Sequence, residues 1–293
     1  MMNKFNLWRI KIAKHYLLFI HVLHKNLFLM IGFYGLLLAL LLCLFTPWLA
    51  PDSQQTYPSL RLLLPAWYEQ GQLNHILGID NHGYDIFKRL LWASKNSLFI
   101  TLLITFSVMI IGSIISLCAV FIKSSSRIIL ITCKTITTIP PLLTMIIFAF
   151  FSGNSVQNLM FVIILSMLPR FIYNIYNMMS SELKKTYITA ARLDGLSTLS
   201  IMRYSILPNT WNNYIRETIA IFTTSLIALT TLTFLNFGVE SNHNELGMMM
   251  HDMIAIIAIN YWGFIAPGLV ILVMILLLNF FDYGLRQSLS HRE

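Results

Sequence analysis

The sequence predicts an all-α membrane protein with six transmembrane helices. Hydrophobic residues make up 57% of the 293 residues and charged residues only 11%, whereas a typical soluble domain has about 25% charged residues. The apolar residues lie in long continuous runs, unlike the alternating pattern of barrel strands. Because a helix satisfies its own backbone hydrogen bonds, such runs are expected to cross the lipid as helices.

Six apolar runs are long enough to cross the hydrocarbon core, which takes roughly 20 helical residues. The third run is interrupted by Pro140 and Pro141, so we expect a kink or local unwinding there. A role in a transport pathway and a role in packing are both open for this kink. The runs are Leu27–Phe45, Ser97–Ile122, Ile128–Phe150, Val156–Tyr173, Ile215–Phe237 and Trp262–Phe281.

These runs divide the chain into four parts. Residues 1–26 mix basic and apolar side chains, which is typical of an amphipathic helix on a membrane surface. Residues 27–96 contain the first span and a long loop, and residues 97–285 contain the other five spans with a polar segment at about 182–209. Residues 286–293 form a short tail.

Lys and Arg are unevenly distributed among the connecting segments. Residues 1–26 contain five of them and no acid, whereas residues 239–261 contain three acids and no Lys or Arg. The positive-inside rule then predicts that both termini are cytoplasmic. The same pattern explains the net charge of +8, together with attraction to anionic lipid, and no motif for nucleic-acid binding is present. The segments assigned to the inside also carry Arg170, Lys184, Lys185, Arg192, Arg203 and Arg216.

The polar segment, TYITAARLDGLSTLSIMRYSILPNTW, runs from Thr186 to Trp211. Its paired Ala residues favour helix, and Gly195 fits the left-handed residue that follows a helix end. Residues 196–207 predict a second short helix closed by Pro208. The expected unit is a helix, a Gly turn and a helix, with a smooth Ala surface on which another protein can dock.

The long loop contains GIDNHGYD, residues 78–85. Its Asp80 and Asp85, with His75 and His82, could suggest a metal site or an acid–base pair, but we favour turn chemistry, in which Asp and Asn side chains bond to the local backbone. Residues 86–96 predict an interfacial helix before the second span. No HExxH, GxSxG or P-loop motif is present, so neither an enzyme nor ATP hydrolysis by this chain is predicted.

Two motifs resemble those of the permeases of bacterial ABC importers. Thr189 replaces Glu in the family pattern E-A-A-x-x-x-G, which is followed nine residues later by I-x-L-P with Ser205 in place of Ile. The loop resembles L-G-T-D-x-x-G-R-D-x-x-S-R of the dipeptide/oligopeptide subfamily, including its Sap-type peptide permeases, and residues 245–250 resemble E-W-G-x-M-L. The matching residues are Ala190, Ala191, Gly195, Leu207 and Pro208 in the first motif, Leu77, Gly78, Asp80, Gly83, Asp85 and Arg89 in the second, and Glu245 and Gly247 in the third.

The resemblance implies a type I ABC importer permease fold and peptide transport by alternating access. It implies four partners besides membrane lipid: a second homologous permease subunit, two cytoplasmic ATPase subunits and a periplasmic substrate-binding protein. ATP and Mg would then bind the ATPases, with no cofactor or metal in this chain. The residues implied in coupling to the ATPase are Thr189, Ala190, Ala191, Arg192, Asp194, Gly195, Leu207 and Pro208.

Three alternatives remain beside this hypothesis. A stand-alone ion-coupled carrier is disfavoured because its spans would need deep acids or His, which are nearly absent here. A membrane scaffold would have no reason for an ordered docking segment. A Sap-type complex that moves haem or a polyamine in place of peptide stays open, because the sequence does not separate pathway-facing from lipid-facing positions.

Overall fold

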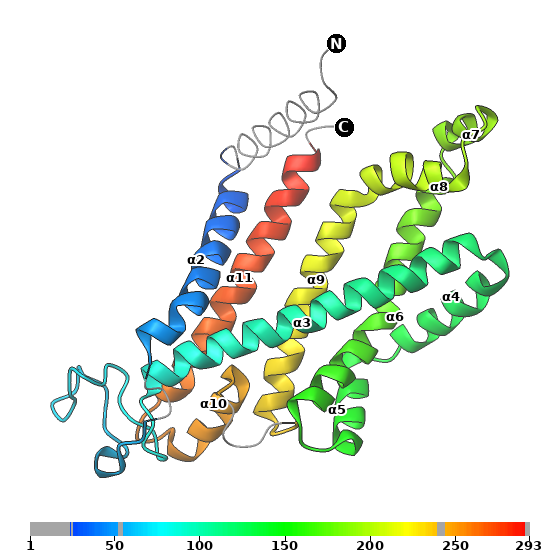
Figure 1. Ribbon diagram of the computed structural model, residues 1–293. Coiled ribbons are helices and arrows are strands. Elements are labelled where there is room, and N and C mark those ends of the chain that lie inside the picture. The colour runs from blue at the N-terminus through cyan, green and yellow to red at the C-terminus, as the bar shows by residue number, and fades with distance from the viewer. Residues whose placement is uncertain (1–23, 25, 52–54, 239–243, 291–293) are drawn as a thin grey trace. The chain divides into compact units, whose positions relative to one another are not determined.

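The computed structural model describes residues 24, 26–51, 55–238 and 244–290 (Figure 1). The amphipathic helix predicted over residues 1–26 therefore lies almost wholly outside the described residues. The chain forms two compact units, Met1–Phe45 with Leu269–Glu293, and Thr46–Gly268. Each unit is helical. The β structure among the described residues is limited to isolated bridges in the loop before residue 86.

In the first unit, most of α2 (Leu27–Leu49) packs against the later part of α11 (Trp262–Ser290). A Cβ atom on Gly32 would lie 2.5 Å from the backbone nitrogen of Phe281, and one on Gly284 would lie 2.5 Å from that of Leu29. Small residues on both helices therefore bring the two backbones together, as is common between membrane helices.

In the second unit, the core lies among α3 (Ile86–Phe121), α6 (Val156–Leu183) and α9 (Leu207–Phe234). Gly112 of α3 faces Phe171 of α6, where an added Cβ would lie 2.4 Å from the ring. One turn along, Ser116 Oγ donates to the carbonyl of Ile172 at 3.2 Å. Gly112 and Ser116 therefore allow α3 and α6 to pack closely.

Shorter elements complete the second unit. They are the 3-10 turn η1 (Pro58–Leu60), α4 (Lys123–Thr137), α5 (Pro141–Ser152), α7 (Thr186–Leu193), α8 (Thr198–Ile201), the π-helical turn η2 (Met202–Ile206), α10 (Leu246–Met253) and η3 (Ile254–Ile256).

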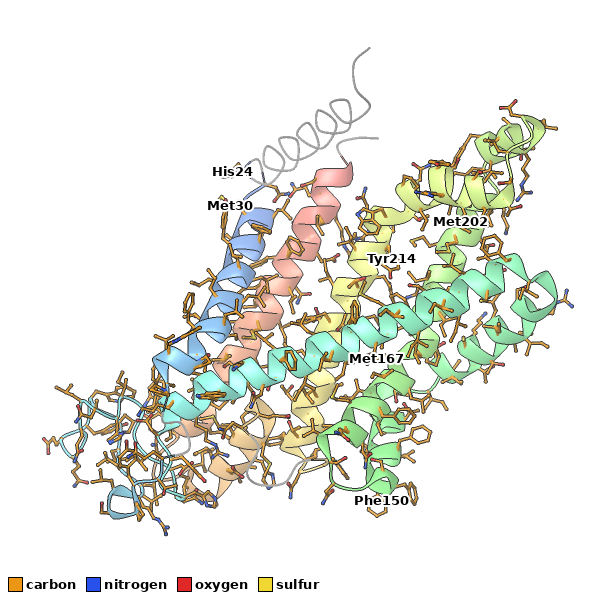
Figure 2. All side chains as sticks on the ribbon, in the orientation of Figure 1. His24, Met30, Phe150, Met167, Met202 and Tyr214 are labelled. Carbon is orange, nitrogen blue, oxygen red and sulfur yellow. The ribbon has the colours of Figure 1, made fainter. Side chains whose placement is uncertain are left out.

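The all-α membrane architecture is confirmed. Five helical stretches of the described residues are long and apolar enough to cross a membrane, and the bent pair α4–α5 makes a sixth if it counts as one span. Large apolar side chains stand exposed on these helices, among them Phe106 and Phe161, and Phe150 projects from α5 (Figure 2). Exposed side chains of this kind are expected where a helix faces lipid.

Two helix predictions need correction. The interfacial helix expected over residues 86–96 is not separate, because α3 runs unbroken from Ile86 to Phe121 and no Gly or Pro precedes Gly112 within it. The kink expected at Pro140 and Pro141 is a full break, across which α4 and α5 meet at 89°. Two consecutive prolines remove two backbone donors, so the helix ends and a new one begins with Pro141 in its first turn.

Candidate functional site

The Gly turn after α7 has the predicted geometry. Gly195 has a φ of +79°, and the backbone N–H of Leu196 donates to the carbonyl of Ala191 at 3.1 Å, while that of Gly195 donates to Arg192 at 3.1 Å. This bond pair defines a Schellman helix end. Ser197 then caps α8, since its Oγ accepts from the backbone N–H of Ser200 at 3.3 Å. The turn is therefore fixed by its own backbone.

This turn presents apolar side chains to solvent. Leu193 is 85% exposed and Leu199 is 75% exposed, although leucine usually lies in the interior. The buried Ile188 holds α7 on the core, and Ala191 is half-buried beside it. The other predicted coupling residues of this turn lie exposed on the same projecting segment, and they are Thr189, Ala190, Arg192, Asp194 and Gly195.

The predicted end of the second helix at Pro208 is wrong. α8 covers only Thr198–Ile201 and passes through the π-helical turn into α9, which contains Pro208 in its first turn. In the π-helical turn, the N–H of Leu207 donates five residues back to the carbonyl of Met202. The backbone N–H groups of the first helical turn have no partner within the helix, so a proline costs nothing there. Leu207 and Pro208 therefore begin the next long helix.

A hydrogen-bonded link at the base of α7 was not found from the sequence. The Tyr187 hydroxyl donates to the Glu182 carboxylate at the end of α6, and it accepts from Asn209 Nδ2 of α9 at 2.9 Å. Lys185 Nζ also lies 2.7 Å from Glu182. Burial and the bond to Glu182 raise the pKa of Tyr187, so the hydroxyl keeps its proton. α7 is therefore tied to both neighbouring long helices.

The second motif forms a buried charge cluster. Arg89 is 2% exposed, and its guanidinium contacts the carboxylates of Asp80, at 2.9 Å, and Asp252. Asp80 also accepts the backbone N–H groups of His82 and Tyr84 at 2.9 and 2.8 Å. The motif therefore joins the loop to α3 and α10, and the predicted turn chemistry is only part of its role. Asp252 was not identified from the sequence, although its loop has three acids and no cation of its own.

Asp85 has two roles at the start of α3. Its Oδ1 caps the helix by accepting the N–H groups of Phe87 and Lys88, and its Oδ2 lies 2.7 Å from Nδ1 of His75. The chain reverses at Gly78 and Gly83, with φ of +84° and +90°, and Leu77 accepts a bond from Asn260 at 3.3 Å. No group of three or more possible metal ligands occurs among the described residues.

The third motif lies at the start of α10. A Cβ on Gly247 would lie 2.1 Å from the carbonyl oxygen of Thr230, so glycine allows α10 to pack directly on α9. Glu245 is 1% exposed and neither carboxylate oxygen has a hydrogen-bond partner. Burial raises the pKa of Glu245 to about 7. Gly247 thus has a packing role, and Glu245 is a buried acid without a partner.

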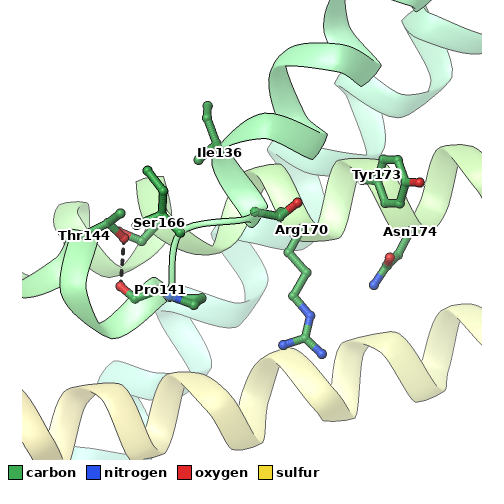
Figure 3. Close-up of a pocket in the computed structure, with 9 residues that line it drawn as sticks. Ile136, Pro141, Thr144, Ser166, Arg170, Tyr173 and Asn174 are labelled. Carbon is green, nitrogen blue, oxygen red and sulfur yellow. Dashed lines mark hydrogen bonds between the residues drawn. The ribbon is translucent and has the colours of Figure 1, made fainter.

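The break between α4 and α5 borders a pocket of about 350 Å³ beside α6 (Figure 3). At the break, Thr137 Oγ1 donates to the Lys134 carbonyl, Thr138 Oγ1 to that of Thr135, and Thr144 Oγ1 to that of Pro141, at 2.7 to 2.8 Å. The first bond satisfies the Lys134 carbonyl, because the N–H of Thr138, four residues on, donates to Thr135 in its place. The pocket wall also contains Ser166 and Arg170 of α6.

The Gly195 turn and the Asp80–Arg89 cluster lie on an all-helical membrane protein. Comparison with known families agrees with this description. Residues 108–291 match the family of binding-protein-dependent transport system inner membrane components. The chain belongs to this family, and it is therefore a multi-pass inner membrane permease component. The match covers more than half of the sequence and includes α6 to α11 together with all of the Gly195 turn.

Individual relatives are peptide permeases. The chain is 32% identical to the peptide transport system permease protein SapC of Escherichia coli O6:H1, over 89% of this chain and 88% of the relative. It is 29% identical to SapC of Haemophilus influenzae, over 92% of both chains. It is 30% identical to the di/tripeptide transport system permease protein DppC of Pseudomonas aeruginosa, over 88% of this chain and 86% of the relative.

The fold is also found in a solved transporter. The MetNI methionine ABC transporter, in an inward-facing conformation, matches with a TM-score of 0.58 over 70% of this chain and 97% of that chain, at 15% identity. At this identity the match concerns the fold, which is the type I ABC importer permease fold. The chain is thus a transport subunit of the peptide ABC permease family, as its motifs indicated.

Proposed function

We propose that this chain is one permease subunit of an ABC transporter that moves peptides across the inner membrane by alternating access. The projecting Gly195 turn supports the proposal most strongly. It is a backbone-bonded apolar turn on the segment where the family motif lies, and no described residue of the chain covers Leu193 or Leu199. A groove on a cytoplasmic ATPase subunit is the proposed binding surface for it.

Force from the ATPase enters through α7 in this proposal. The buried Ile188 and the Tyr187 link connect α7 to α6 and α9, so α7 moves together with both long helices. Packed helices move as rigid bodies more readily than they deform. A shift of the docked turn then tilts α6 and α9 and opens the pathway to the other side.

The remaining parts have corresponding roles. A second homologous permease subunit completes the pathway, and two ATPases bind ATP and Mg on the cytoplasmic side. A periplasmic substrate-binding protein delivers solute to the loop that contains Asp80 and is joined to Arg89 of α3. Both termini are cytoplasmic, in accordance with the distribution of Lys and Arg. The chain itself carries no cofactor, contacts membrane lipid and does not bind nucleic acid.

The solute is proposed to be a peptide, and an antimicrobial peptide of the Sap type is the finer form of this proposal. The names of the relatives support a peptide. Haem and a polyamine are the other solutes to be compared with peptides in transport assays. A stand-alone carrier is not favoured, because the chain belongs to a family of transport-system components.

Copurification tests the docking surface. The chain is expressed with its second permease and the candidate ATPases, and the ATPase content of the purified complex is measured. Leu193→Glu places a charge on the proposed docking surface and should release the ATPase. Leu73→Glu is the matched control, because Leu73 is 88% exposed in the opposite loop and Leu193 is 85% exposed. A Leu193→Glu complex with full ATPase content would contradict the proposal.

A further inference from the structure

The pocket at the α4–α5 break has one charged side chain in its wall, Arg170. Arg170 is 14 residues beyond the first residue of α6, Val156, which corresponds to about 21 Å of helix. It had been assigned by sequence to an inside connection, but it lies in the middle of the 28-residue helix. A charged residue within a membrane span is costly and usually serves a function.

Arg170 has no acidic partner in the described part of the chain, where no ion pair or hydrogen bond of its side chain occurs. Glu217 of α9 is an acid that contacts α6. Its carboxylate accepts a hydrogen bond from Asn174 Nδ2 of α6 at 2.8 Å and does not pair with Arg170. Figure 3 shows the Arg170 side chain extending away from α6. Its guanidinium is therefore free to bind an anion.

A second polar group on the same face of α6 lacks a partner. Ser166 precedes Arg170 by four residues, a spacing that places both on one helix face, and its buried Oγ has no hydrogen-bond partner. The hydroxyl of Thr144 in the pocket wall already donates to Pro141. Ile136, Ile139 and Pro141 form the apolar part of the wall, and Thr137, Tyr173 and Asn174 complete it. The pocket thus offers one cation, Arg170, and a buried hydroxyl without a partner, Ser166, in a wall of mixed polar and apolar side chains.

We propose that this pocket binds a carboxylate of the transported solute, and that for a peptide this group is the C-terminal carboxylate. A guanidinium pairs with a carboxylate through two parallel hydrogen bonds, and Ser166 supplies a third donor. A volume of about 350 Å³ is at the lower end of ligand pockets, so it holds the end of a peptide and not the whole chain. A polyamine would be repelled by Arg170.

The inference rests on the proposed peptide transport, and paired peptides test it. The complete complex in proteoliposomes is given trialanine, trialanine amide or Ala-Asp-Ala amide, and ATP-dependent uptake is measured. For the unchanged protein, trialanine uptake should exceed trialanine amide uptake about tenfold. Arg170→Gln should remove this preference by lowering trialanine uptake about tenfold and leaving amide uptake unchanged, and Arg170→Lys should keep part of it.

Lys134→Gln is the control, because Lys134 is a cation of the neighbouring helix α4 outside the pocket wall, and its preference should stay unchanged. Good uptake of Ala-Asp-Ala amide that depends on Arg170 would support a carboxylate site but overturn the C-terminal assignment. Equal loss of trialanine and its amide in Arg170→Gln, or no loss of either, would overturn the carboxylate site itself. A complex that moves none of the peptides would contradict the proposed function as well, which distinguishes the two failures.

Discussion

The hydroxyl of Tyr187 joins Glu182 to Asn209, and so connects the end of α6 to the first turn of α9 through one side chain of α7. The residue next to it, Ile188, is fully buried in the core. α7 therefore has a hydrophobic anchor and a hydrogen-bonded one. Replacing Tyr187 by Phe, which lacks only the hydroxyl oxygen, removes the hydrogen-bonded anchor and leaves the hydrophobic one.

Tyr187→Phe should weaken the coupling of ATP hydrolysis to transport. The change removes two hydrogen bonds at a half-exposed site and should cost about 1 kcal/mol of stability, so the complex still assembles. Transport per ATP hydrolysed should fall because α7 moves with less restraint from α6 and α9. Tyr204→Phe is the control, since Tyr204 is 73% exposed on the neighbouring π-helical turn. An unchanged ratio in Tyr187→Phe would show that Ile188 alone holds α7.

Substitutions of Gly195 should follow backbone conformation and not side-chain size. A Cβ there meets no atom within 4 Å, but φ is +79°, so an alanine costs about 1 kcal/mol through strain alone. Gly195→Val should lower transport and stimulated ATP hydrolysis while membrane insertion is unchanged. Gly195→Asn should retain most activity, because Asn tolerates the left-handed region. Equal defects in the Val and Asn variants would contradict a conformational cause.

Stability should fall with rising pH because of Glu245. Its folded-state pKa is raised to about 7, above an ordinary value of about 4.3, so the folded protein binds more protons between these values. Stability from this group is therefore full below about pH 4 and is lost progressively up to about pH 7, by at most about 4 kcal/mol.

Glu245→Gln removes this titration and should raise the melting temperature at pH 8 more than at pH 5. Thermal unfolding in detergent from pH 5 to pH 8 measures both proteins. Glu240→Gln is the control for a general effect of removing an acid from the same segment. A melting temperature of Glu245→Gln that changes with pH as steeply as that of the unchanged protein would contradict the assignment.

Arg89→Ala should destabilise the loop strongly. It leaves the carboxylates of Asp80 and Asp252 without their cation in a buried site, and removing one partner of a buried ion pair costs about 3–5 kcal/mol. Arg89→Lys should recover only part of this, because Lys lacks the forked guanidinium. Arg61→Ala, an exposed arginine of the same loop, should have little effect. The yield and melting temperature of the purified protein measure all three.

The sequence predicts local backbone geometry well where one residue determines it. The left-handed turn at Gly195 and the bonds of Asp80 and Asp85 to the local backbone depend on neighbours within a few residues. Pro208 was assigned wrongly because a proline is compatible both with the end of one helix and with the first turn of the next. Only the π-helical turn, set by tertiary packing, decides between them.

Contacts distant in sequence could not be predicted. Asp252 lies 163 residues from Arg89, and the sequence contains no signal that pairs them. The two prolines marked the position of the break between α4 and α5, but the 89° angle depends on how both helices pack on α6. The charge of Arg170 placed it in a cytoplasmic connecting segment by sequence. The helix in fact continues ten residues beyond the predicted end at Tyr173, so Arg170 lies in the middle of α6.

The unbroken course of α3 has a mechanical consequence. Its 36 residues form a rod of about 54 Å, with the Arg89 cluster at one end and the packing against Phe171 and Ile172 in its second half. A rod that does not bend converts a push on the loop into a tilt of its far half. In the proposed transporter, solute delivered at the outer face therefore acts near the inner face through the backbone of α3, without passing along the pathway.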